Sequence, residues 1–314
     1  MTPDRTHVIL NPASGAGKTG QYQNEILALA ARHLGRGFSL CVTRRPREAT
    51  DSARLAIAAG AERIVVVGGD GTIQEAVNGF FSNGRPLNPD CVLGILSAGT
   101  GRGFAQSFRL PVERERQLAV IVGGHCRRVD IGRAVFINGQ GLPEERYFVN
   151  ECQAGIGGEV VRRVGRGNKR LGGRLAFAAG AIAASLRYPN RPIAVAVDGR
   201  PAGPRMLVGL VIGNGEFMAG GMRMTPRAEL GDGLFDILFL PAQRRLERLR
   251  NFLKIYSGTH IALPQFDYVQ GRTITLSSPE EVAFEADGEL WGSLPCRVEI
   301  VPGLLQILSP GREA

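Results

Sequence analysis

The chain has 314 residues, 44% of them hydrophobic, with 38 Lys or Arg against 29 Asp or Glu and a formal net charge of +9. This length exceeds what one hydrophobic core usually supports, so two domains are expected. The positive charge favours an anionic partner such as a nucleotide, a nucleic acid or an acidic membrane surface. Only 6% of the residues are aromatic, and no basic segment carries interleaved aromatics, so a nucleic-acid partner is not expected.

The cysteines and the N-terminus bear on the cellular compartment. The five cysteines are odd in number and lack any C-x-x-C pair, which argues against a disulfide framework and a zinc site. Residues 1–7 contain no apolar signal-peptide region, and the longest uncharged stretch, residues 175–186, is too short to cross a bilayer. We expect a cytoplasmic protein that makes peripheral contact with a membrane.

The first 130 residues alternate between apolar strands and helices. In chain order the pattern predicts a strand at 7–10, a helix at 21–34, a strand at 38–43, a helix at 47–59, a strand at 64–67, a helix at 74–81, a strand at 92–96 and helices at 101–108 and 112–122. Such alternation indicates a parallel sheet covered on both faces. Ligands of these sheets bind beyond the carboxyl ends of the strands, where residues 11–15, 68–72 and 97–101 fall, with Thr43 on the same side.

After about residue 128 the pattern changes to short strands separated by Gly and Pro. The predicted strands are 127–136, 147–152, 193–197, 206–213, 234–240, 273–276, 282–285 and 296–301, with helices at 171–186 and 244–256. This pattern is typical of a mainly antiparallel sandwich or barrel. We therefore expect an α/β domain at 1–128 and a β-sandwich domain at 129–303, with residues 304–314 available to return to the first.

The segment from Gly68 to Thr72 reads Gly-Gly-Asp-Gly-Thr and joins an apolar strand to a helix. Unpaired amides at a helix N-terminus bind anions, and glycines let the backbone approach a phosphate closely. Asp70 is the residue in the turn that could reach a metal ion accompanying the phosphates. A tight turn with an acidic N-cap fits the same residues.

The ending Gly17-Lys18-Thr19 suggests a Walker A loop, but the first glycine of that motif would fall on Pro12. Proline has no N–H and fixes φ, so the usual phosphate cradle could not form. A different glycine-rich phosphate loop after the first strand is expected instead.

Three further segments carry charges with more than one interpretation. Asp287-Gly288-Glu289 follows a strand and could supply a general base, or could be an ordinary hairpin turn. The loop 229–234 could wrap a hard cation or be an ordinary loop. A basic run could contact anionic lipid headgroups or form a solvated face. That run comprises Arg162, Arg163, Arg166, Lys169, Arg170 and Arg174.

Taken together, these segments resemble the diacylglycerol-kinase catalytic-domain family, in particular bacterial lipid kinases related to sphingosine, ceramide and NAD kinases. The resemblance runs nearly end to end. It comprises Asn11-Pro12 with Ser14-Gly15, Gly68 to Thr72 with Glu75 and Asn78-Gly79, Gly99-Thr100 with Phe104-Ala105, Gly213-Asn214-Gly215 with Gly220-Gly221-Met222, Pro226-Arg227-Ala228, Asp232 to Asp236, and Asp287-Gly288-Glu289. Their joint order and spacing favour the phosphate and general-base interpretations.

The resemblance implies an NAD-kinase-like nucleotide domain with a parallel sheet, a C-terminal β-sandwich, and ATP bound in the cleft between them. The nucleotide positions are Asn11, Thr43, Gly68, Gly69, Asp70, Gly71, Thr72, Gln74, Glu75, Gly99, Thr100 and Arg102. The catalytic positions are Asp287, as general base, and Glu289 beside it. Glu229, Asp232 and the backbone carbonyl of Leu234 form a structural Mg²⁺ site, and a second Mg²⁺ accompanies ATP near Asp70.

Three departures from the family pattern lie on the nucleotide side, where the usual P-x-G-T-x-N-D-F-A is here Ser97-Ala98-Gly99-Thr100-Gly101-Arg102-Gly103-Phe104-Ala105. Gln74 replaces the usual Asn, and Arg102 replaces another amide with a cation that could bind a phosphate or change the phosphodonor.

The sequence predicts an ATP- and Mg²⁺-dependent lipid kinase that phosphorylates a hydroxyl of diacylglycerol, phosphatidylglycerol, ceramide or a sphingoid base. The alternatives are a kinase of a soluble acceptor such as NAD, and a nucleotide-binding sensor that has lost catalysis. A homodimer is compatible with the sequence.

Overall fold

The computed structural model describes residues 5–82, 84–99, 102–166, 187–218 and 220–311. The chain forms two compact units. Unit 1 comprises residues 1–129 together with 303–314, and unit 2 comprises residues 130–302. These bounds differ by one residue from those expected from the sequence.

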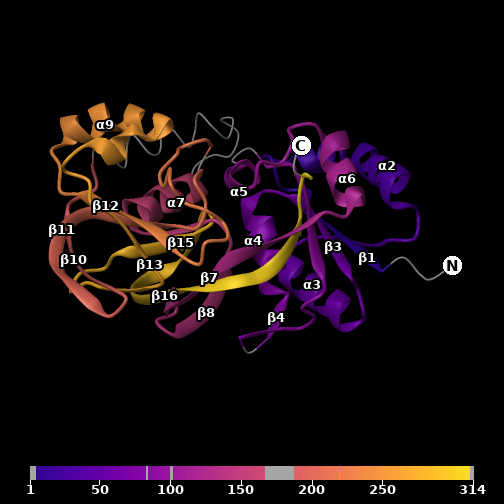
Figure 1. The fold of residues 1–314 in the computed structure, drawn as a ribbon, viewed down its shortest axis with the longest axis horizontal. Coiled ribbons are helices and arrows are strands. Elements are labelled where there is room, and N and C mark those ends of the chain that lie inside the picture. Colours follow the sequence, from indigo (N-terminus) through magenta and orange to yellow (C-terminus); the bar gives the residue numbers. More distant parts are fainter. Residues whose placement is uncertain (1–4, 83, 100–101, 167–186, 219, 312–314) are drawn as a thin grey trace. The chain divides into compact units, whose positions relative to one another are not determined.

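Unit 1 contains a parallel sheet with helices on it (Figure 1). Its strands are β1 (Thr6–Leu10), β2 (Ser39–Val42), β3 (Arg63–Gly68) and β6 (Val92–Ser97), and a short antiparallel pair is formed by β4 (Phe81–Ser82) and β5 (Arg85–Pro86). Its helices are α1 (Lys18–Gln21), α2 (Gln23–Leu34), α3 (Glu48–Ala58), α4 (Asp70–Asn78), α5 (Gly103–Ser107) and α6 (Arg114–Gly123). Strand β1 pairs with β2 and β3, and β3 pairs with β6, all in parallel register.

The last strand of the chain completes this sheet. Strand β16 (Glu289–Leu308) pairs in parallel with β6 through Gln306 and Ile307. Ile307 is fully buried and Leu308 belongs to the same core as α2 and α6. The apolar residues after position 303 therefore return to unit 1, which the sequence left open between the two domains.

Apolar side chains alternate across the sheet of unit 1. Val8 and Leu10 pack with residues of α2 and α6, while α3 and α4 pack together and against β1 and β3. Both faces of the strands are thus buried, which explains why their sequences are apolar throughout.

Unit 2 is mainly antiparallel β-structure. Its strands are β7 (Cys126–Asn138), which begins in unit 1, β8 (Pro143–Phe148), β9 (Glu151–Gly155), β10 (Arg191–Val197), β11 (Arg200–Gly213), β12 (Phe235–Pro241), β13 (Tyr268–Gly271), β14 (Thr273–Ser277), β15 (Ala283–Ala286) and the first part of β16. The pairings run from β13 through β12, β11, β10 and β14 to β16, and β9 bridges β11 and β15. Only unit 1 has the parallel pairing expected of its sequence; the fold as a whole is mainly β.

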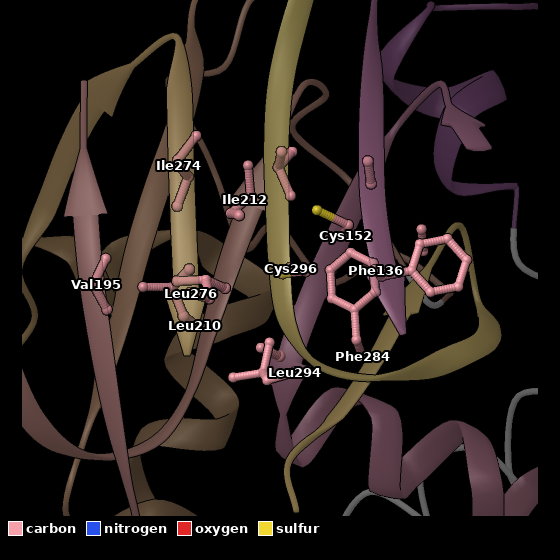
Figure 2. Close-up of a cluster of buried hydrophobic side chains, with 14 of the residues drawn as sticks. Phe136, Cys152, Val195, Leu210, Ile212, Ile274, Leu276, Phe284, Leu294 and Cys296 are labelled. Carbon is pink, nitrogen blue, oxygen red and sulfur yellow. The ribbon is translucent and has the colours of Figure 1, made fainter. Parts of the chain in front are cut away.

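The core of unit 2 lies between these strands (Figure 2). Leu210 and Ile212 of β11 are fully buried, as are Ile274 and Leu276 of β14. Aromatic rings fill the region beside them, with the ring centroids of Phe136 and Trp291 5.1 Å apart. Burial of this apolar face is the main stabilising contribution to the unit.

One helix of unit 2 was not expected from the sequence pattern. Helix α7 (Ile156–Arg166) follows β9 directly, although Gly157 and Gly158 disfavour a helix on propensity alone. Helix α9 (Arg245–Ser257) is present as expected and is followed by a short 3₁₀ helix, η1 (Thr259–Ala262). The helix predicted at 171–186 lies outside the described residues. None of the described helices is both long and apolar enough to cross a lipid bilayer.

Replacing Leu210 by Ala should lower the free energy of unfolding by about 2–5 kcal/mol, because the side chain is fully buried in the core of unit 2. Leu253→Ala is the matched control, since Leu253 of α9 is 76% exposed and its truncation should change stability by less than about 0.5 kcal/mol. Urea unfolding followed by circular dichroism measures both. Equal stability losses in the two variants would contradict this packing.

Candidate functional site

Three loops meet at the carboxyl edge of the sheet in unit 1. They follow β1, β3 and β6, whose parallel pairing brings their ends to one edge. Nδ2 of Asn11 donates a hydrogen bond to Oγ1 of Thr72 over 2.9 Å, and the amide of Ala98 donates to the carbonyl of Gly68 over 2.8 Å. The sequence segments predicted to bind nucleotide are therefore brought together within one unit.

Glycines allow these loops to approach closely. A Cβ atom on Gly99 would lie 2.6 Å from Cα of Gly69, and one on Gly15 would lie 2.7 Å from the carbonyl oxygen of Ala98. Gly15 also has a φ of +62°, which favours glycine. Any larger residue at Gly99 would separate the loops after β3 and β6.

The N-terminus of α4 begins inside this group of loops. Gly69 is its N-cap in an extended conformation, without a side-chain cap. Within the described ranges, the amides of Gly71 and Thr72 have no hydrogen-bond partner. Free amides at the positive end of a helix dipole attract an anion, so this corner fits the phosphate groups of a nucleotide.

The carboxylate of Asp70 binds helix α5. Its Oδ2 accepts a hydrogen bond from the amide of Gly103 over 2.9 Å, and its Oδ1 accepts one from Phe104 over 3.3 Å. Burial raises the pKa of Asp70, and these two bonds and the charge of Arg102 oppose that rise. Asp70 thus positions the loop after β6, a role that the sequence did not indicate; its contact with a metal ion stays a prediction.

Arg102 precedes α5 and has a left-handed φ of +50°. Its Nη2 donates to the carbonyl of Pro111 over 2.8 Å, so part of the guanidinium is occupied within unit 1. Its Nε is buried and has no hydrogen-bond partner among the described residues. A phosphate bound by Arg102 would therefore have to use the remaining donors. Thr100, predicted to contact the nucleotide, lies outside the described residues.

Three other predicted nucleotide residues, Thr43, Gln74 and Glu75, are partly or fully buried in unit 1, and Glu75 binds the start of α3. Oε1 of Glu75 accepts a hydrogen bond from the amide of Arg47 over 2.9 Å, at the start of α3. Burial raises the pKa of Glu75, while this amide acts in the opposite direction. Gln74 is buried. Thr43 is also buried and donates its amide to the carbonyl of Leu10. Nucleotide contacts by these side chains stay predictions.

Asp287 lies in a two-residue hairpin turn between β15 and β16. Asp287 and Gly288 have φ values of +48° and +79°, as a type I′ turn requires. The carboxylate is buried, and it accepts hydrogen bonds from the amides of Val149 over 2.8 Å, Asn150 over 2.9 Å and Glu151 over 3.1 Å. The segment is therefore a hairpin turn that also carries a fixed, negatively charged side chain.

Asn214 supports the loop that receives Asp287. It is fully buried, and its Nδ2 donates to the carbonyls of Asp130 over 2.8 Å and Val149 over 2.7 Å. The amide of Asn214 donates to the carbonyl of Asn150 over 2.8 Å. The Gly-Asn-Gly segment of the sequence thus has a structural role, because its asparagine orients the amides that bind Asp287.

Glu285 is a second carboxyl group beside Asp287, and the sequence analysis did not select it. It is buried in β15, and its Oε2 accepts a hydrogen bond from the amide of Gly288 over 3.1 Å. Strand alternation was the available signal, because a residue two positions before Asp287 lies on the same face. Glu289, predicted to assist Asp287, is partly buried at the start of β16, and its role stays a prediction.

The loop of the predicted Mg²⁺ site is fixed by Asp130. Oδ2 of Asp130 accepts the amide of Gly233 over 2.7 Å, and Oδ1 of Asp232 accepts the amide of Leu234 over 3.0 Å. Burial, followed by the charges of Asp130 and Glu229, raises the pKa of Asp232. Among the described residues, no group of three or more His, Cys, Asp or Glu side chains could hold a metal ion.

Part of the predicted membrane-contacting segment is paired internally. Arg162 forms an ion pair with Glu159 of the same helix, and Nε of Arg163 lies 2.6 Å from the other carboxylate oxygen. Burial alone would raise the pKa of Glu159, but the two arginines outweigh it and lower this pKa. The structure gives no side-chain description for the other four basic residues of the run.

The two units match models of known families. Residues 5–134 match the diacylglycerol kinase catalytic domain, and residues 150–309 match the YegS C-terminal NAD kinase beta sandwich-like domain. The chain therefore belongs to the diacylglycerol kinase catalytic-domain family, which is a family of kinases. The expected NAD-kinase-like fold with a C-terminal β-sandwich is confirmed at this level.

Individual relatives span almost the whole chain. A diacylglycerol kinase of Staphylococcus carnosus is 27% identical over 307 residues, which cover 98% of this chain and 95% of that protein. A diacylglycerol kinase of Mycobacterium tuberculosis is 28% identical over 303 residues, covering 96% and 94%. The crystal structure of a diacylglycerol kinase from Bacillus anthracis has the same fold, with a TM-score of 0.70, 20% identity and full coverage of both chains.

Gly99→Ala should weaken the binding of a non-hydrolysable ATP analogue by at least about tenfold, because the new Cβ forces the loops after β3 and β6 apart. Isothermal titration calorimetry measures the affinity. Gly139→Ala is the control, since nothing lies within 4 Å of a Cβ there. Unchanged affinity in Gly99→Ala would show that nucleotide binding does not depend on this approach.

Asn214→Ala should lower the free energy of unfolding by about 1–3 kcal/mol, because two buried carbonyls lose their donor. Chemical denaturation compares this variant with Gln140→Ala, whose side chain is exposed. A loss no greater than that of the surface control would contradict the supporting role of Asn214.

Proposed function

We propose that the chain is an ATP-dependent lipid kinase that transfers a phosphoryl group to a hydroxyl of a membrane lipid. The observation that carries the proposal is the buried carboxylate of Asp287, held by three backbone amides on a tight turn. Membership of the diacylglycerol kinase catalytic-domain family supports the reaction type.

Unit 1 supplies the phosphate-binding part of the proposal. The amides at the start of α4, with Gly69 and Gly99 beside them, offer space and donors for a triphosphate. Bound ATP would supply the γ-phosphoryl group. The protein's own task is to position that group and to stabilise the charge that develops on it.

Unit 2 supplies the base. Asp287 would accept the proton of the lipid hydroxyl while the hydroxyl oxygen bonds to the γ-phosphorus and the bond from that phosphorus to the bridging oxygen breaks, which releases ADP. The three amides fix the carboxylate, so that little reorganisation is needed when the substrate arrives. Oδ1 accepts the amides of Asn150 and Glu151, and Oδ2 accepts the amide of Val149.

Mg²⁺ is proposed as a cofactor in two places. In unit 2, Glu229, Asp232 and the carbonyl of Leu234 would hold a structural ion, which would offset the repulsion among the carboxylates of this loop. In unit 1, a second ion would accompany the nucleotide near Asp70. Two carboxylates and a carbonyl suit a hard cation that keeps several of its waters.

The names of the relatives suggest which lipid accepts the phosphoryl group. Curated relatives named diacylglycerol kinase match at least 93% of this chain, and diacylglycerol is therefore the first acceptor to test. Peripheral membrane association through the basic run that begins at Arg162 belongs to the same proposal. The described part of the run is already paired with Glu159, so any such contact would depend chiefly on the residues beyond it.

The direct test uses radiolabelled ATP and vesicles that contain diacylglycerol, phosphatidylglycerol, ceramide or a sphingoid base, with NAD as the soluble acceptor. We expect label in a lipid and none in NAD. Label in NAD alone would support the soluble-acceptor kinase. ATP binding with no labelled product would support a nucleotide-binding sensor.

Asp287→Asn should reduce transfer to lipid by about 10²- to 10⁴-fold, because the amide cannot accept the proton of the hydroxyl. Binding of an ATP analogue should be unchanged, and circular dichroism should show a folded protein. Asp90→Asn, at an exposed position, is expected to keep full activity. Turnover in Asp287→Asn close to that of the unmodified protein would remove the assigned base.

A further inference from the structure

One face of the β9–β15 pair is polar although it is buried. Glu151 and Gln153 of β9 and Glu285 and Asp287 of β15 and its turn are between 1% and 9% exposed. The register places Glu285 opposite Gln153, and residues two apart share a face. The alternate residues Cys152, Ala154, Phe284 and Ala286 belong to the apolar core on the other face.

Helix α7 covers this polar face. It packs against both β9 and β15, and a Cβ on Gly157 would collide with the side chain of Gln153. A Cβ on Gly158 would lie 2.7 Å from Cβ of Ala283. The two glycines disfavour this helix by propensity, but they let it lie close to the strands. The helix in this position keeps water away from the carboxyl groups.

The two carboxyl groups on β15 have different environments. Asp287 accepts three backbone amides, whereas Glu285 accepts one, from Gly288. No Lys, Arg or His forms an ion pair with Glu285 among the described residues. Hydrogen bonds favour the charged form of a carboxyl group, and burial without them favours the neutral form. The pair thus resembles other sites in which two neighbouring acids are held in different protonation states.

These surroundings favour the protonated form of Glu285. Burial is the largest cause and raises the pKa of Glu285 to about 8; the amide of Gly288 opposes the rise, and the negative charge of Asp287 adds to it. The proton makes Glu285 a hydrogen-bond donor as well as an acceptor. Its acceptor oxygen binds the turn that carries Asp287.

We propose that Glu285 is a positioning residue for Asp287, which in its protonated form fixes the Asp287-Gly288 turn and keeps a second negative charge away from the general base. The proposal rests on the function assigned to Asp287 above. Ionisation of Glu285 would place two anions two residues apart in one buried turn and would disfavour the geometry that catalysis needs.

Other titratable groups stand on the elements packed against β15. They are Glu151 and Cys152 of β9, Glu159 with its partners Arg162 and Arg163 of α7, and Glu289 of β16. The two arginines are already bound to Glu159, and burial raises the pKa of Cys152 well above its ordinary value. For Glu285, the raised pKa of about 8 predicts a charge change just above neutral pH.

The kinetic test compares kcat/KM for lipid phosphorylation against pH in four proteins: the unmodified chain, Glu285→Gln, Glu285→Ala and the surface control Glu281→Gln. The unmodified chain and the control should lose activity as pH rises through about 8. Glu285→Gln should keep activity within about threefold at pH 7 and lose this upper limb, because its amide is always neutral and still accepts the Gly288 amide. Glu285→Ala should lose at least about tenfold in kcat with little change in KM.

Either of two results would overturn the proposal. One is a Glu285→Gln profile that declines above pH 8 like that of the unmodified chain. The other is a loss in Glu285→Gln at pH 7 as large as that in Glu285→Ala, which would assign Glu285 a merely structural role or one that needs its charge.

Urea unfolding gives a readout that does not depend on turnover. Between the ordinary pKa of about 4.5 and the folded value of about 8, the folded chain binds more protons than the unfolded chain, so its free energy of unfolding falls as pH rises. The stability of Glu285→Gln relative to the unmodified chain should therefore increase over this interval and level off above it. Parallel curves would contradict the buried, protonated state.

The two readouts separate this inference from the proposed function. If the stability difference appears but no acceptor is phosphorylated, the protonated Glu285 stands while the kinase function, and with it the positioning role, is contradicted. If lipid is phosphorylated but the stability curves and pH profiles of Glu285→Gln match those of the unmodified chain, the function stands and the role of Glu285 falls.

Discussion

A buried carboxylate costs several kcal/mol unless hydrogen bonds replace the water that it loses, and Asp287 meets this requirement with three successive backbone amides at residues 149–151. Those amides point at one place because Asn214 holds the carbonyls of Asp130 and Val149. The β9–β15 pairing, the hairpin turn and the Gly-Asn-Gly segment are thus parts of one arrangement. The proposed general base can therefore be buried only because this hydrogen-bond network supplies donors to its carboxylate.

Unit 1 brings glycine-rich loops together at the carboxyl edge of its sheet, where we propose that a triphosphate binds. These loops approach as closely as Gly69 and Gly99 permit, and among the described residues the amides of Gly71 and Thr72 at the start of α4 have no hydrogen-bond partner. The acids of this region are used inside the unit: Asp70 binds the start of α5, and Glu75 binds the start of α3. Carboxylates that accept hydrogen bonds from amides at helix N-termini stabilise those helices.

Particular residues show how far sequence reasoning could go. Asp287 was open to two interpretations, a hairpin turn and a general base, and the structure shows the hairpin in a form that presents the carboxylate. Helix α7 was missed because Gly157 and Gly158 disfavour a helix locally. Its close packing against β9 and β15, however, favours glycine at these two positions. Asp70 and Glu75 were selected for the nucleotide, and their partners could not have been foreseen, since the amides that they bind lie 33 and 28 residues away in sequence.

The sequence by itself determined most of the strands and helices, the positions of the glycine-rich turns and the family, because these depend on local periodicity and on motifs whose spacing the chain preserves. Only the tertiary structure decided which of the two carboxyl groups of Glu285 and Asp287 would accept three backbone amides. Glu285 lies on β15 and Asp287 lies in the turn that follows, and the local sequence does not indicate how many amides each accepts. Their difference arises from long-range contacts, since a carboxyl group responds to the donors and the burial that surround it in three dimensions.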